Sequence, residues 1–463
     1  MSSVRRVVAN LGFFLQITGL LLILPIAIGL QNGELKSLAS LFATSFLSFG
    51  IGFVFNSFCE RKELDEKTSL WLMLATFTIL PMVLMIPFVW NNVFNNSSPF
   101  DLLTNSYFET ISGFTTTGFT FVQQPEALPY SLLFYRSLVE FIGGVGFIYL
   151  LTGFFYPNDS LEEYANSFGI GKLSPNLRKV FASVILVYTF IVIIFTIIFY
   201  FTYYPSIIIA SCTAIDVLTG GYQPNVASGI GLFQISILIL MLLGSLNFQF
   251  HYNILHYKLR NLITPEIKLY LGSIVVFSLI ICILAWINPF ESLFNVVSMA
   301  SSTGIDLSNI ASSAPSAKIV FILIGLIGGC AFSMAGGIRY QRIKAIISAV
   351  LKKEDQPTHE ELKTIFVYVI CFVVTLVVLS LSFSTMGISL LDSVFEVGSA
   401  MTTNGISMGA TTVIMPMGHK WLMIFAMLIG RIEILSIFAA ISSLPLWEPV
   451  KFLGRTIRKT IHR

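Results

Sequence analysis

The chain has 463 residues, of which 55% are apolar and only 11% are charged. A soluble globular domain carries about 25% charged residues, so this composition excludes an ordinary soluble protein and predicts a protein that lies in a lipid bilayer. The formal net charge is +3. It arises from loops between apolar segments, so no nucleic-acid partner is needed to explain it.

Ten apolar stretches are long enough to cross a bilayer, because one crossing needs about 20 residues. They cover residues 11–30, 37–57, 69–90, 131–155, 180–204, 230–250, 269–288, 317–350, 364–385 and 421–446. The eighth stretch is much longer than one crossing needs, and glycines interrupt it. We therefore predict that it contains an unwound segment, although a close-packing face of small residues is an alternative.

The distribution of basic residues predicts the orientation, because cytoplasmic loops carry an excess of Lys and Arg. With the N-terminus in the cytoplasm, all but five of the 27 Lys and Arg residues fall on the cytoplasmic side. The exceptions are Lys36, Arg136, Lys318 and Lys420, expected outside, and Arg431, expected within the last span. The basic C-terminal tail is then cytoplasmic, and we expect it to meet anionic membrane lipid.

The strongest signal is a short motif that recurs between apolar segments. The pattern Phe-x-x-x-Ser-x-x-(Ser/Thr)-(Ser/Thr)-x-Gly occurs three times, ending at Gly118, Gly304 and Gly405. A looser copy runs from Ser211 to Gly221. In the predicted orientation each copy lies outside, between a helix that leaves the cytoplasm and a helix that returns. The chain thus contains four helix–loop–helix repeats after an N-terminal pair of helices.

These repeats predict the organisation of the chain. The helix pair is expected at 1–60, and the repeats at 69–156, 175–260, 266–350 and 362–463, the last with the basic tail. Within them, residues 101–117, 206–219, 290–303 and 389–404 are too short to span and too apolar for solvated loops. They are typical of re-entrant pore helices, which need protein or water around their ends. The predicted fold class is an all-α polytopic membrane protein, with ten transmembrane helices and four helix–pore loop–helix repeats around a central pore.

Four related loops can surround one axis, and glycine permits the dihedral angles at which backbone carbonyls turn toward a cation. The motif therefore predicts an ion selectivity filter. Its expected residues are Thr116, Thr117, Gly118, Thr219, Gly220, Gly221, Ser302, Thr303, Gly304, Thr403, Asn404 and Gly405. In the second loop either Gly220 or Gly221 could be the filter glycine, and we prefer Gly221 because it places Thr219 in register.

Charged residues inside the apolar segments are few. Arg431 near the middle of a span costs about 2.5–3.5 kcal/mol on an insertion scale, so it should face water or a partner. An ion pair with Glu433, or a bond to a cluster of carbonyls, is the structural alternative. Glu109 and Glu396 each stand nine residues before a motif glycine and are expected to be buried acceptors that steady the loop. Asp306 follows Gly304 at the outer mouth, where it could concentrate cations.

No grouping of residues predicts an enzyme, since Ser/His/Asp, Cys/His and paired-carboxylate patterns are missing from the sequence. The five cysteines are scattered and indicate neither disulfides nor a metal site. His251 and His256 lie at the end of a span, where helix-end hydrogen bonding is a better explanation than metal binding.

The motifs resemble the Trk/Ktr/HKT superfamily of cation transport subunits, and specifically its bacterial Trk type. The resemblance rests on residues 112–118, 135–146, 244–251, 328–337 and 430–435, and it extends over nearly the whole chain. The two extra N-terminal helices favour Trk over Ktr. The resemblance implies that the transported ion is potassium, bound at Thr116, Thr117, Thr219, Gly220, Ser302, Thr303, Thr403 and Asn404. It also implies a gate below the filter, formed by Arg431 with Gly328, Gly329, Ser333, Gly336 and Gly337.

The same resemblance implies a homodimer in the bacterial inner membrane, regulated by a cytoplasmic nucleotide-binding subunit of the TrkA type. Potassium would flow through a gated channel-like pore along the membrane potential. A symporter that couples K⁺ to H⁺ or Na⁺, a sodium-permeable transporter of the same fold, and a membrane scaffold or sensor are the alternatives. Three departures bear on selectivity and gating. They are Thr-Gly-Gly-Tyr in the second loop, Thr-Asn-Gly-Ile in the fourth loop, and Met334 where a smaller residue is expected.

Overall fold

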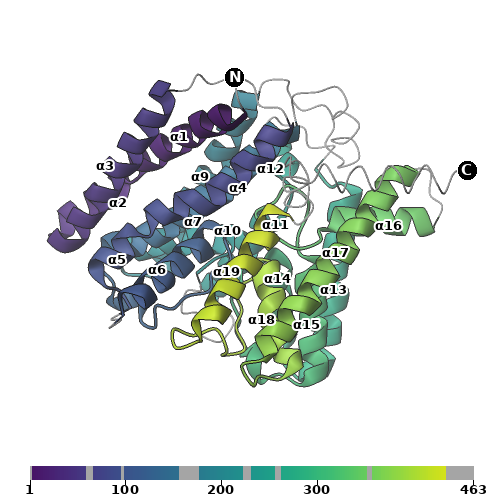
Figure 1. The fold of residues 1–463 in the computed structure, drawn as a ribbon. Coiled ribbons are helices and arrows are strands. Elements are labelled where there is room, and N and C mark those ends of the chain that lie inside the picture. Colours follow the sequence, from purple (N-terminus) through teal and green to yellow (C-terminus); the bar gives the residue numbers. More distant parts are fainter. Residues whose placement is uncertain are drawn as a thin grey trace, which may run out of the picture.

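A computed structural model describes residues 3–58, 66–94, 98–155, 177–222, 231–255, 262–351 and 357–433. This part of the chain is helical and contains no strand. Its helices are α1 (Ser3–Leu21), α2 (Ile23–Asn32), α3 (Leu35–Phe58), α4 (Glu66–Leu84), α5 (Ile86–Asn91), α6 (Pro99–Phe114), α7 (Tyr130–Phe155), α9 (Leu177–Thr202), α10 (Ile207–Thr219), α11 (Leu232–Ser245), α12 (Phe248–Leu255), α13 (Pro265–Ala285), α14 (Pro289–Ser301), α15 (Pro315–Ile327), α16 (Tyr340–Val350), α17 (His359–Ser384), α18 (Leu390–Met401) and α19 (Met417–Ile432). Figure 1 shows their arrangement.

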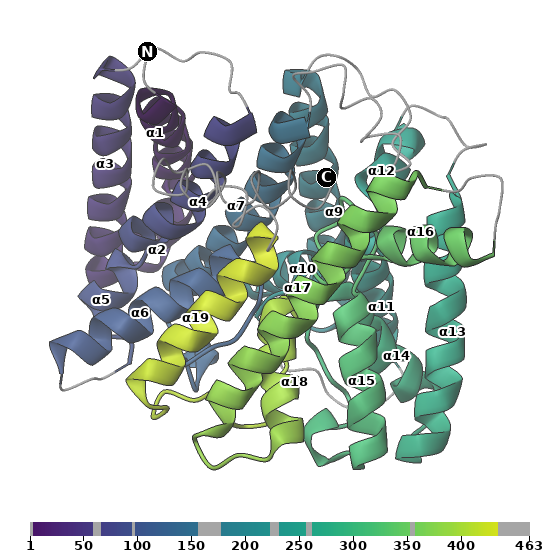
Figure 2. The ribbon, with the colours of Figure 1, turned by 45° about the vertical axis from the view of Figure 1, so that its right-hand side comes forward.

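A long helix, a short helix and a further helix follow one another four times. The short helices are α6, α10, α14 and α18, and they lie where the sequence predicts segments too short to span. Figure 2 shows α1 and α3 together at one edge of the molecule, outside this pattern. There Gly12 and Gly52 allow close packing, since a Cβ on Gly12 would lie 2.9 Å from the carbonyl oxygen of Gly52.

Local sequence explains where the short helices begin. Pro99 and Pro289 stand in the first turns of α6 and α14, where proline removes no intrahelical hydrogen bond. Ser389 caps α18, its hydroxyl accepting a 3.1 Å hydrogen bond from the backbone N–H of Asp392. Their C-terminal ends, where the chain turns to left-handed backbone, form the candidate site described below.

Membrane-length helices of the described residues cover most of the predicted spans. The described residues contain seven helices long and apolar enough to cross a membrane, or eight if the bent pair α11–α12 is one span. These cover seven of the ten predicted stretches, and the protein is a multi-pass membrane protein. The predicted span at 230–250 is wrong as a straight helix, because the chain bends by 104° between α11 and α12. The span at 317–350 is interrupted between Ile327 and Tyr340, as its glycines predict. The span at 421–446 is described only up to Glu433.

The second helices of three repeats pack closely on the short helices. Gly244 and Gly430 lie against the backbones of α10 and α18, where an added Cβ would overlap the carbonyl oxygens of Leu218 and Met401. Gly143 of α7 lies in the same way against Phe114 at the end of α6. Through such contacts the second helix of a repeat supports the end of the short helix as well as crossing the membrane.

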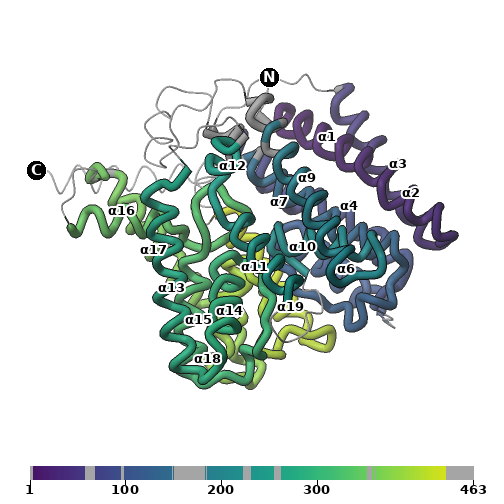
Figure 3. Tube along the Cα trace, turned by 180° about the vertical axis from the view of Figure 1, so that it is seen from behind, coloured from purple at the N-terminus to yellow at the C-terminus, as the bar shows by residue number. Residues whose placement is uncertain are grey.

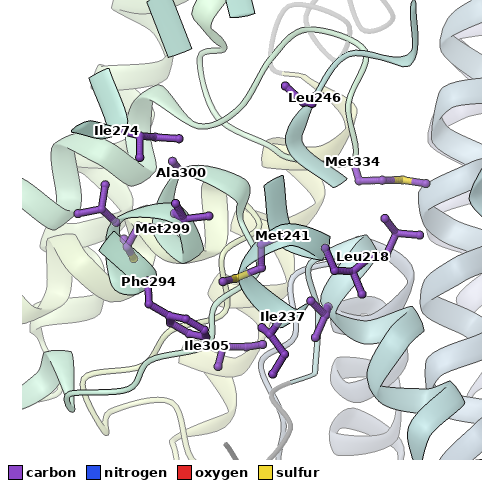
Figure 4. Packing of buried hydrophobic residues seen from close by; sticks show 14 of the residues in the cluster. Leu218, Ile237, Met241, Leu246, Ile274, Phe294, Met299, Ala300, Ile305 and Met334 are labelled. Carbon is purple, nitrogen blue, oxygen red and sulfur yellow. The ribbon is translucent and has the colours of Figure 1, made fainter. Parts of the chain in front are cut away.

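Three clusters of buried apolar side chains hold these elements together. One joins the N-terminal helices to the first repeat, one joins α17–α19 to α6, and the largest joins the second and third repeats. Figure 4 shows part of the largest cluster, with Leu218, Met241, Met299 and Ile305. Seen from behind in Figure 3, α9, α10 and α11 cover one side of the molecule, and α16 extends away from it.

Several predicted features lie outside the described residues. These are Cys59, His256, the C-terminal basic tail and many of the cytoplasmic Lys and Arg residues. Among the described residues the four remaining cysteines are free, and no group of His, Cys, Asp or Glu could hold a metal ion. The His251 ring nitrogen lies 2.9 Å from the carbonyl oxygen of Leu243. This confirms the prediction of helix-end hydrogen bonding for that histidine.

Candidate functional site

Four loops, each at the C-terminal end of a short helix, form the candidate site. We call them loops 1 to 4: Thr115–Gly118, Thr219–Tyr222, Ser301–Gly304 and Thr402–Gly405. Each begins with the same turn, in which a backbone N–H bonds to the carbonyl five residues earlier. The bonds run from Thr117 to Ser112 (2.8 Å), from Gly221 to Asp216 (3.0 Å), from Thr303 to Ser298 (3.0 Å) and from Asn404 to Ser399 (2.8 Å).

The residue before each of these donors has left-handed backbone. It is Thr116 (φ 56°), Gly220 (φ 85°), Ser302 (φ 56°) and Thr403 (φ 53°) in loops 1 to 4. For Thr and Ser this conformation costs on the order of 1–3 kcal/mol, and it persists only where the surroundings enforce it. The strain therefore repeats at one position in three of the four loops.

The turns correct the register predicted for loop 2. Gly221 takes the place of Thr117, Thr303 and Asn404, so Tyr222 takes the place of the motif glycines. Gly118, Gly304 and Gly405 have φ values of 84°, 76° and 76°, whereas Gly221 has no positive φ. The turns therefore contradict the register on which the preference for Gly221 rested. The reason is that Gly220 is the left-handed residue of the turn after α10, whereas the predicted alignment placed Thr219, one residue earlier, at that position.

The four loops close into a ring. A Cβ on Gly118 would overlap the carbonyl of Gly221, and one on Gly220 would overlap the carbonyl of Ser302. Likewise, a Cβ on Gly304 would overlap the carbonyl of Asn404, and one on Gly405 would overlap the carbonyl of Thr117. Loop 1 thus contacts loop 2, loop 2 contacts loop 3, loop 3 contacts loop 4, and loop 4 returns to loop 1. The backbones approach so closely that only glycine fits at these contacts.

In loops 1 and 3, hydroxyl groups of the same loop bond to each other. The hydroxyl of Thr117 lies 2.7 Å from that of Thr115, and the hydroxyl of Thr303 lies 2.8 Å from that of Ser301. Asn404 differs, because its amide donates a 2.8 Å hydrogen bond to the carbonyl of Met299 in the neighbouring repeat. The unexpected asparagine in loop 4 therefore links two repeats.

A buried acceptor nine residues before the motif glycine holds the chain after three of the loops. Glu109 accepts from the backbone N–H of Phe121 at 2.9 Å, and Glu396 accepts from that of Met408 at 2.7 Å. Both carboxylates are fully buried, which confirms the prediction that they steady the loops. The sequence analysis missed Asn295, which accepts from the N–H of Leu307 at 3.0 Å. Its place nine residues before Gly304 is the signal that could have identified it.

Loop 2 is held by a different helix. Glu140 of α7 is fully buried, accepts a hydrogen bond from the Thr219 hydroxyl, and accepts another from the backbone N–H of Tyr222 at 3.3 Å. Sequence analysis missed this carboxylate, although it lies one helical turn after Arg136. Arg136 is buried in α7 and forms a 2.9 Å ion pair with Glu109. Burial of this arginine is possible because its charge is paired.

A cavity of about 430 Å³ opens beyond the ring. Gly118 and Gly405 line it together with Asp306, Arg136 and Tyr222. Asp306 accepts a 2.9 Å hydrogen bond from the backbone N–H of Ile310. The structure thus places the predicted mouth carboxylate in the cavity next to the motif glycines.

On the other side of the ring lies the segment that interrupts the eighth predicted span, residues 328–339. Backbone bonds tie it to the bend between α11 and α12: Cys330 N–H to the carbonyl of Ser245, and Met334 N–H to that of Gly244, both 3.1 Å. Glu266 accepts a further 2.7 Å bond from the N–H of Ala331. The bend and the interruption therefore satisfy each other's backbone groups.

Residues 334–336 pass from one side of the ring to the opposite side. The Gly336 N–H donates to the hydroxyl of Ser302 in loop 3 at 3.1 Å, and a Cβ on Gly336 would meet Thr403 of loop 4 at 2.5 Å. The sulfur of Met334 lies 3.0 Å from a Cβ placed on Gly144, which also faces Thr116 of loop 1. Figure 4 shows this side chain pointing away from Met241 and Met299.

Arg431 lies against the same segment. Its guanidinium donates a 2.9 Å hydrogen bond to the carbonyl of Met334 and lies 4.3 Å from the centre of the Phe147 ring. It is 1% exposed. Glu433 does not pair with it; Glu433 bonds instead to Arg342 at 2.7 Å and lies 3.4 Å from Arg339. Within the described chain, Arg431 therefore does not pair with Glu433, and its hydrogen bond goes to a carbonyl, as the other alternative for this residue predicts in part.

The structure brings the four predicted loops together in one ring. It places a second set of predicted residues together on one side of that ring: Gly328, Gly329, Ser333, Gly336, Gly337 and Arg431. Lys420 is buried and donates to Asn105 at 2.8 Å. It joins α19 to α6, and so the fourth repeat to the first.

Known proteins show similarity over most of this chain. The family model described as cation transport protein matches residues 285–446. An uncharacterized cation transporter of Methanocaldococcus jannaschii is 26% identical, with 94% of each chain covered. The Trk system potassium uptake protein TrkG of Escherichia coli is also 26% identical, over 94% of this chain and 96% of that protein.

The Trk system potassium uptake protein TrkH of Salmonella typhimurium is 22% identical over 82% of this chain and 86% of its own length. The crystal structure of the potassium transporter TrkH from Vibrio parahaemolyticus has the same fold. Its TM-score is 0.81, with 19% identity and coverage of 96% of this chain and 99% of that chain. The resemblance found from the motifs is confirmed by these matches.

Ring closure makes a prediction about folding. Gly405→Ala would place a methyl group on the carbonyl of Thr117 at a position with φ 76°, so we expect a large fall in the yield of folded protein and in its melting temperature. Gly418→Ala is the control, because a Cβ at Gly418 meets nothing within 4 Å. Size-exclusion profiles and thermal melts in detergent measure both. Equal behaviour of the two variants would show that the ring is not closed at Gly405.

Proposed function

Because the chain belongs to the Trk/Ktr/HKT superfamily, we propose that it takes up potassium ions across the bacterial inner membrane through a gated, channel-like pore. The observation that carries this proposal is the closed ring of four loops, whose backbones meet at Gly118, Gly220, Gly304 and Gly405. The relatives named as potassium uptake proteins support potassium as the ion.

The ring would act as the selectivity filter. Carbonyl oxygens that replace the hydration shell of a cation must be held in fixed positions around it. Strained backbone at Thr116, Ser302 and Thr403, and the carboxylates behind loops 1 and 4, support such rigidity. Potassium would contact Thr116, Thr117, Ser302, Thr303, Thr403 and Asn404, and in loop 2 the corrected register replaces Thr219 and Gly220 by Gly220 and Gly221. The register places three glycines and Tyr222 at the fourth position of the loops, so this filter departs from a four-glycine ring.

The segment 328–339 and Arg431 would act as the gate. A positive charge in a medium of low dielectric constant repels a passing cation, and residues 334–336 cross beneath the ring. Met334 is the centre of this arrangement, since its carbonyl holds Arg431 and its side chain reaches Gly144. Opening would require this residue to move.

The orientation and assembly follow from the basic residues and from the relatives. We propose cytoplasmic N- and C-termini, a homodimer, contact of the basic tail with anionic lipid, and control by a cytoplasmic nucleotide-binding subunit of the TrkA type. The relatives are named as parts of a Trk system, which supports a partner for this chain.

Potassium-limited growth of a bacterium that lacks its own uptake systems tests the transport proposal. We expect this chain to restore growth and K⁺ influx with little Na⁺ influx. Gly118→Ser meets a contact as close as that of Gly405→Ala, so we expect its folded yield to fall; per folded protein the ratio should shift toward Na⁺, because a side chain at that position displaces the carbonyl of Gly221. Comparable K⁺ and Na⁺ influx in the parent would support the sodium-permeable alternative. An unchanged ratio in Gly118→Ser would remove Gly118 from the filter.

The gate makes a separate prediction. Arg431→Ala and Met334→Ala should each raise K⁺ influx several-fold. The double variant should raise it by less than the two single effects combined, as for coupled neighbours. The K⁺/Na⁺ ratio should stay the same, because the loops are unaltered. Met241→Ala, which also truncates a buried methionine, is the control and should leave influx per folded protein unchanged. Reduced influx in Arg431→Ala at normal folded yield would argue against a gate.

The partner proposal predicts that a nucleotide-binding ring from the same cell co-purifies with the chain and confers nucleotide-dependent flux in liposomes. Flux that responds fully to ATP or NADH with the purified chain alone would contradict it.

A further inference from the structure

Tyr222 occupies an unusual position in loop 2. The register places it where the other loops have Gly118, Gly304 and Gly405, yet its side chain is almost completely buried. A large aromatic residue at that position would obstruct a pore unless its ring were held behind the loop.

Contacts from the first repeat hold the ring in this way. The Tyr222 hydroxyl donates a 2.7 Å hydrogen bond to the carbonyl of Glu109 in α6. Gly113 leaves room for it, since a Cβ there would lie 2.8 Å from the hydroxyl oxygen. The Arg136 guanidinium lies 3.8 Å from the centre of the ring, within the range of a cation–π interaction.

The backbone of Tyr222 is held from the same helix. Its N–H belongs to the peptide group whose carbonyl is that of Gly221, the carbonyl that meets Gly118 in the ring. In a trans peptide the N–H and the C=O point in opposite directions. Glu140 accepts that N–H at 3.3 Å, and its carboxylate fills the space beside the Cα of Gly221. Glu140 therefore turns the Gly221 carbonyl toward loop 1.

Helix α7 thus reaches both loops with two side chains one turn apart. Arg136 is paired with Glu109, which also holds the chain after loop 1 through Phe121. Glu140 holds Thr219 and Tyr222 of loop 2. The relative position of loops 1 and 2 depends on this one helix and on the tyrosine between them.

We propose that Tyr222, held by Arg136 and Glu140 of α7, is a positioning residue that sets the ion specificity of the ring. The aromatic side chain and the backbone N–H of Tyr222 together fix the Gly221 carbonyl against Gly118. This keeps loop 2 at the spacing that a dehydrated K⁺ needs within the ring of four loops. The inference rests on the proposed potassium uptake, and it adds a residue outside the glycine positions that determines which cation passes.

Tyr222→Phe tests the proposal, because it removes the bond to Glu109 and keeps the ring under Arg136. Initial rates of K⁺ and Na⁺ influx are measured in the same uptake-deficient cells and normalised to folded protein in the membrane. We expect the K⁺/Na⁺ ratio to fall several-fold. Tyr107→Phe is the matched control, since the Tyr107 hydroxyl also donates to a helix carbonyl, that of Thr78, at 3.1 Å, and does not contact the loops.

Gly113→Ala provides a second route, in which the tyrosine remains and its hydroxyl is displaced. It should lower the ratio in the same direction. Gly398→Ala is its control, because a Cβ at Gly398 of α18 meets only ordinary contacts at 3.8 and 3.9 Å. The second route also covers the case in which Tyr222→Phe does not fold.

The outcomes separate this proposal from the transport proposal. A parent chain without K⁺ influx contradicts the transport proposal itself, whatever the variants do. A parent that prefers K⁺, with an unchanged ratio in Tyr222→Phe and Gly113→Ala, overturns the role of Tyr222 alone. Loss of K⁺ and Na⁺ influx in equal proportion also overturns it, because a merely structural role changes the rate and leaves the ratio.

Discussion

The approach of four backbones to one another is the constraint on which the rest of this structure depends. At each contact a glycine Cα faces a carbonyl of the next loop so closely that a methyl group has no space. Three Ser and Thr residues adopt left-handed backbone immediately before these contacts. Strain of this kind must be held by the surroundings, and the buried acceptors Glu109, Asn295 and Glu396 supply part of the restraint through backbone N–H groups three residues beyond each motif glycine.

The second helix of a repeat takes its shape from the same constraint. Gly143, Gly244 and Gly430 allow α7, α11 and α19 to lie directly against the ends of α6, α10 and α18. Helices that serve as supports need not be straight. The bend after Ser245 and the interruption after Ile327 exchange backbone hydrogen bonds with each other, so irregular backbone inside the membrane is satisfied by protein, as a bilayer requires.

Much of this architecture could be predicted from the sequence. Hydropathy predicts seven of the spans, and the recurring motif predicts the four short helices, because both signals are local. The bend after α11 could not be predicted, because residues 230–250 are predominantly apolar and the bend is held by hydrogen bonds to residues 328–339, far along the chain. The register of loop 2 could not be predicted for a similar reason. By residue type Thr219 can be aligned with either Thr115 or Thr116 of loop 1, and only the hydrogen bond from Gly221 to Asp216 shows which alignment holds. Glu140 was missed because it serves a loop about 80 residues away along the chain.

The four loops belong to one polypeptide, and this has a consequence for how the ring can vary. In a tetramer of identical subunits, symmetry would copy every change into all four quadrants. Here one quadrant has Tyr222, another has Asn404, and Arg431 comes from the last repeat. Four arginines at the depth of Arg431 would place four positive charges around a single axis, a barrier too large for a cation to cross. A chain that carries its fourfold arrangement internally can adjust ion preference and closure one residue at a time, and so in small energetic steps.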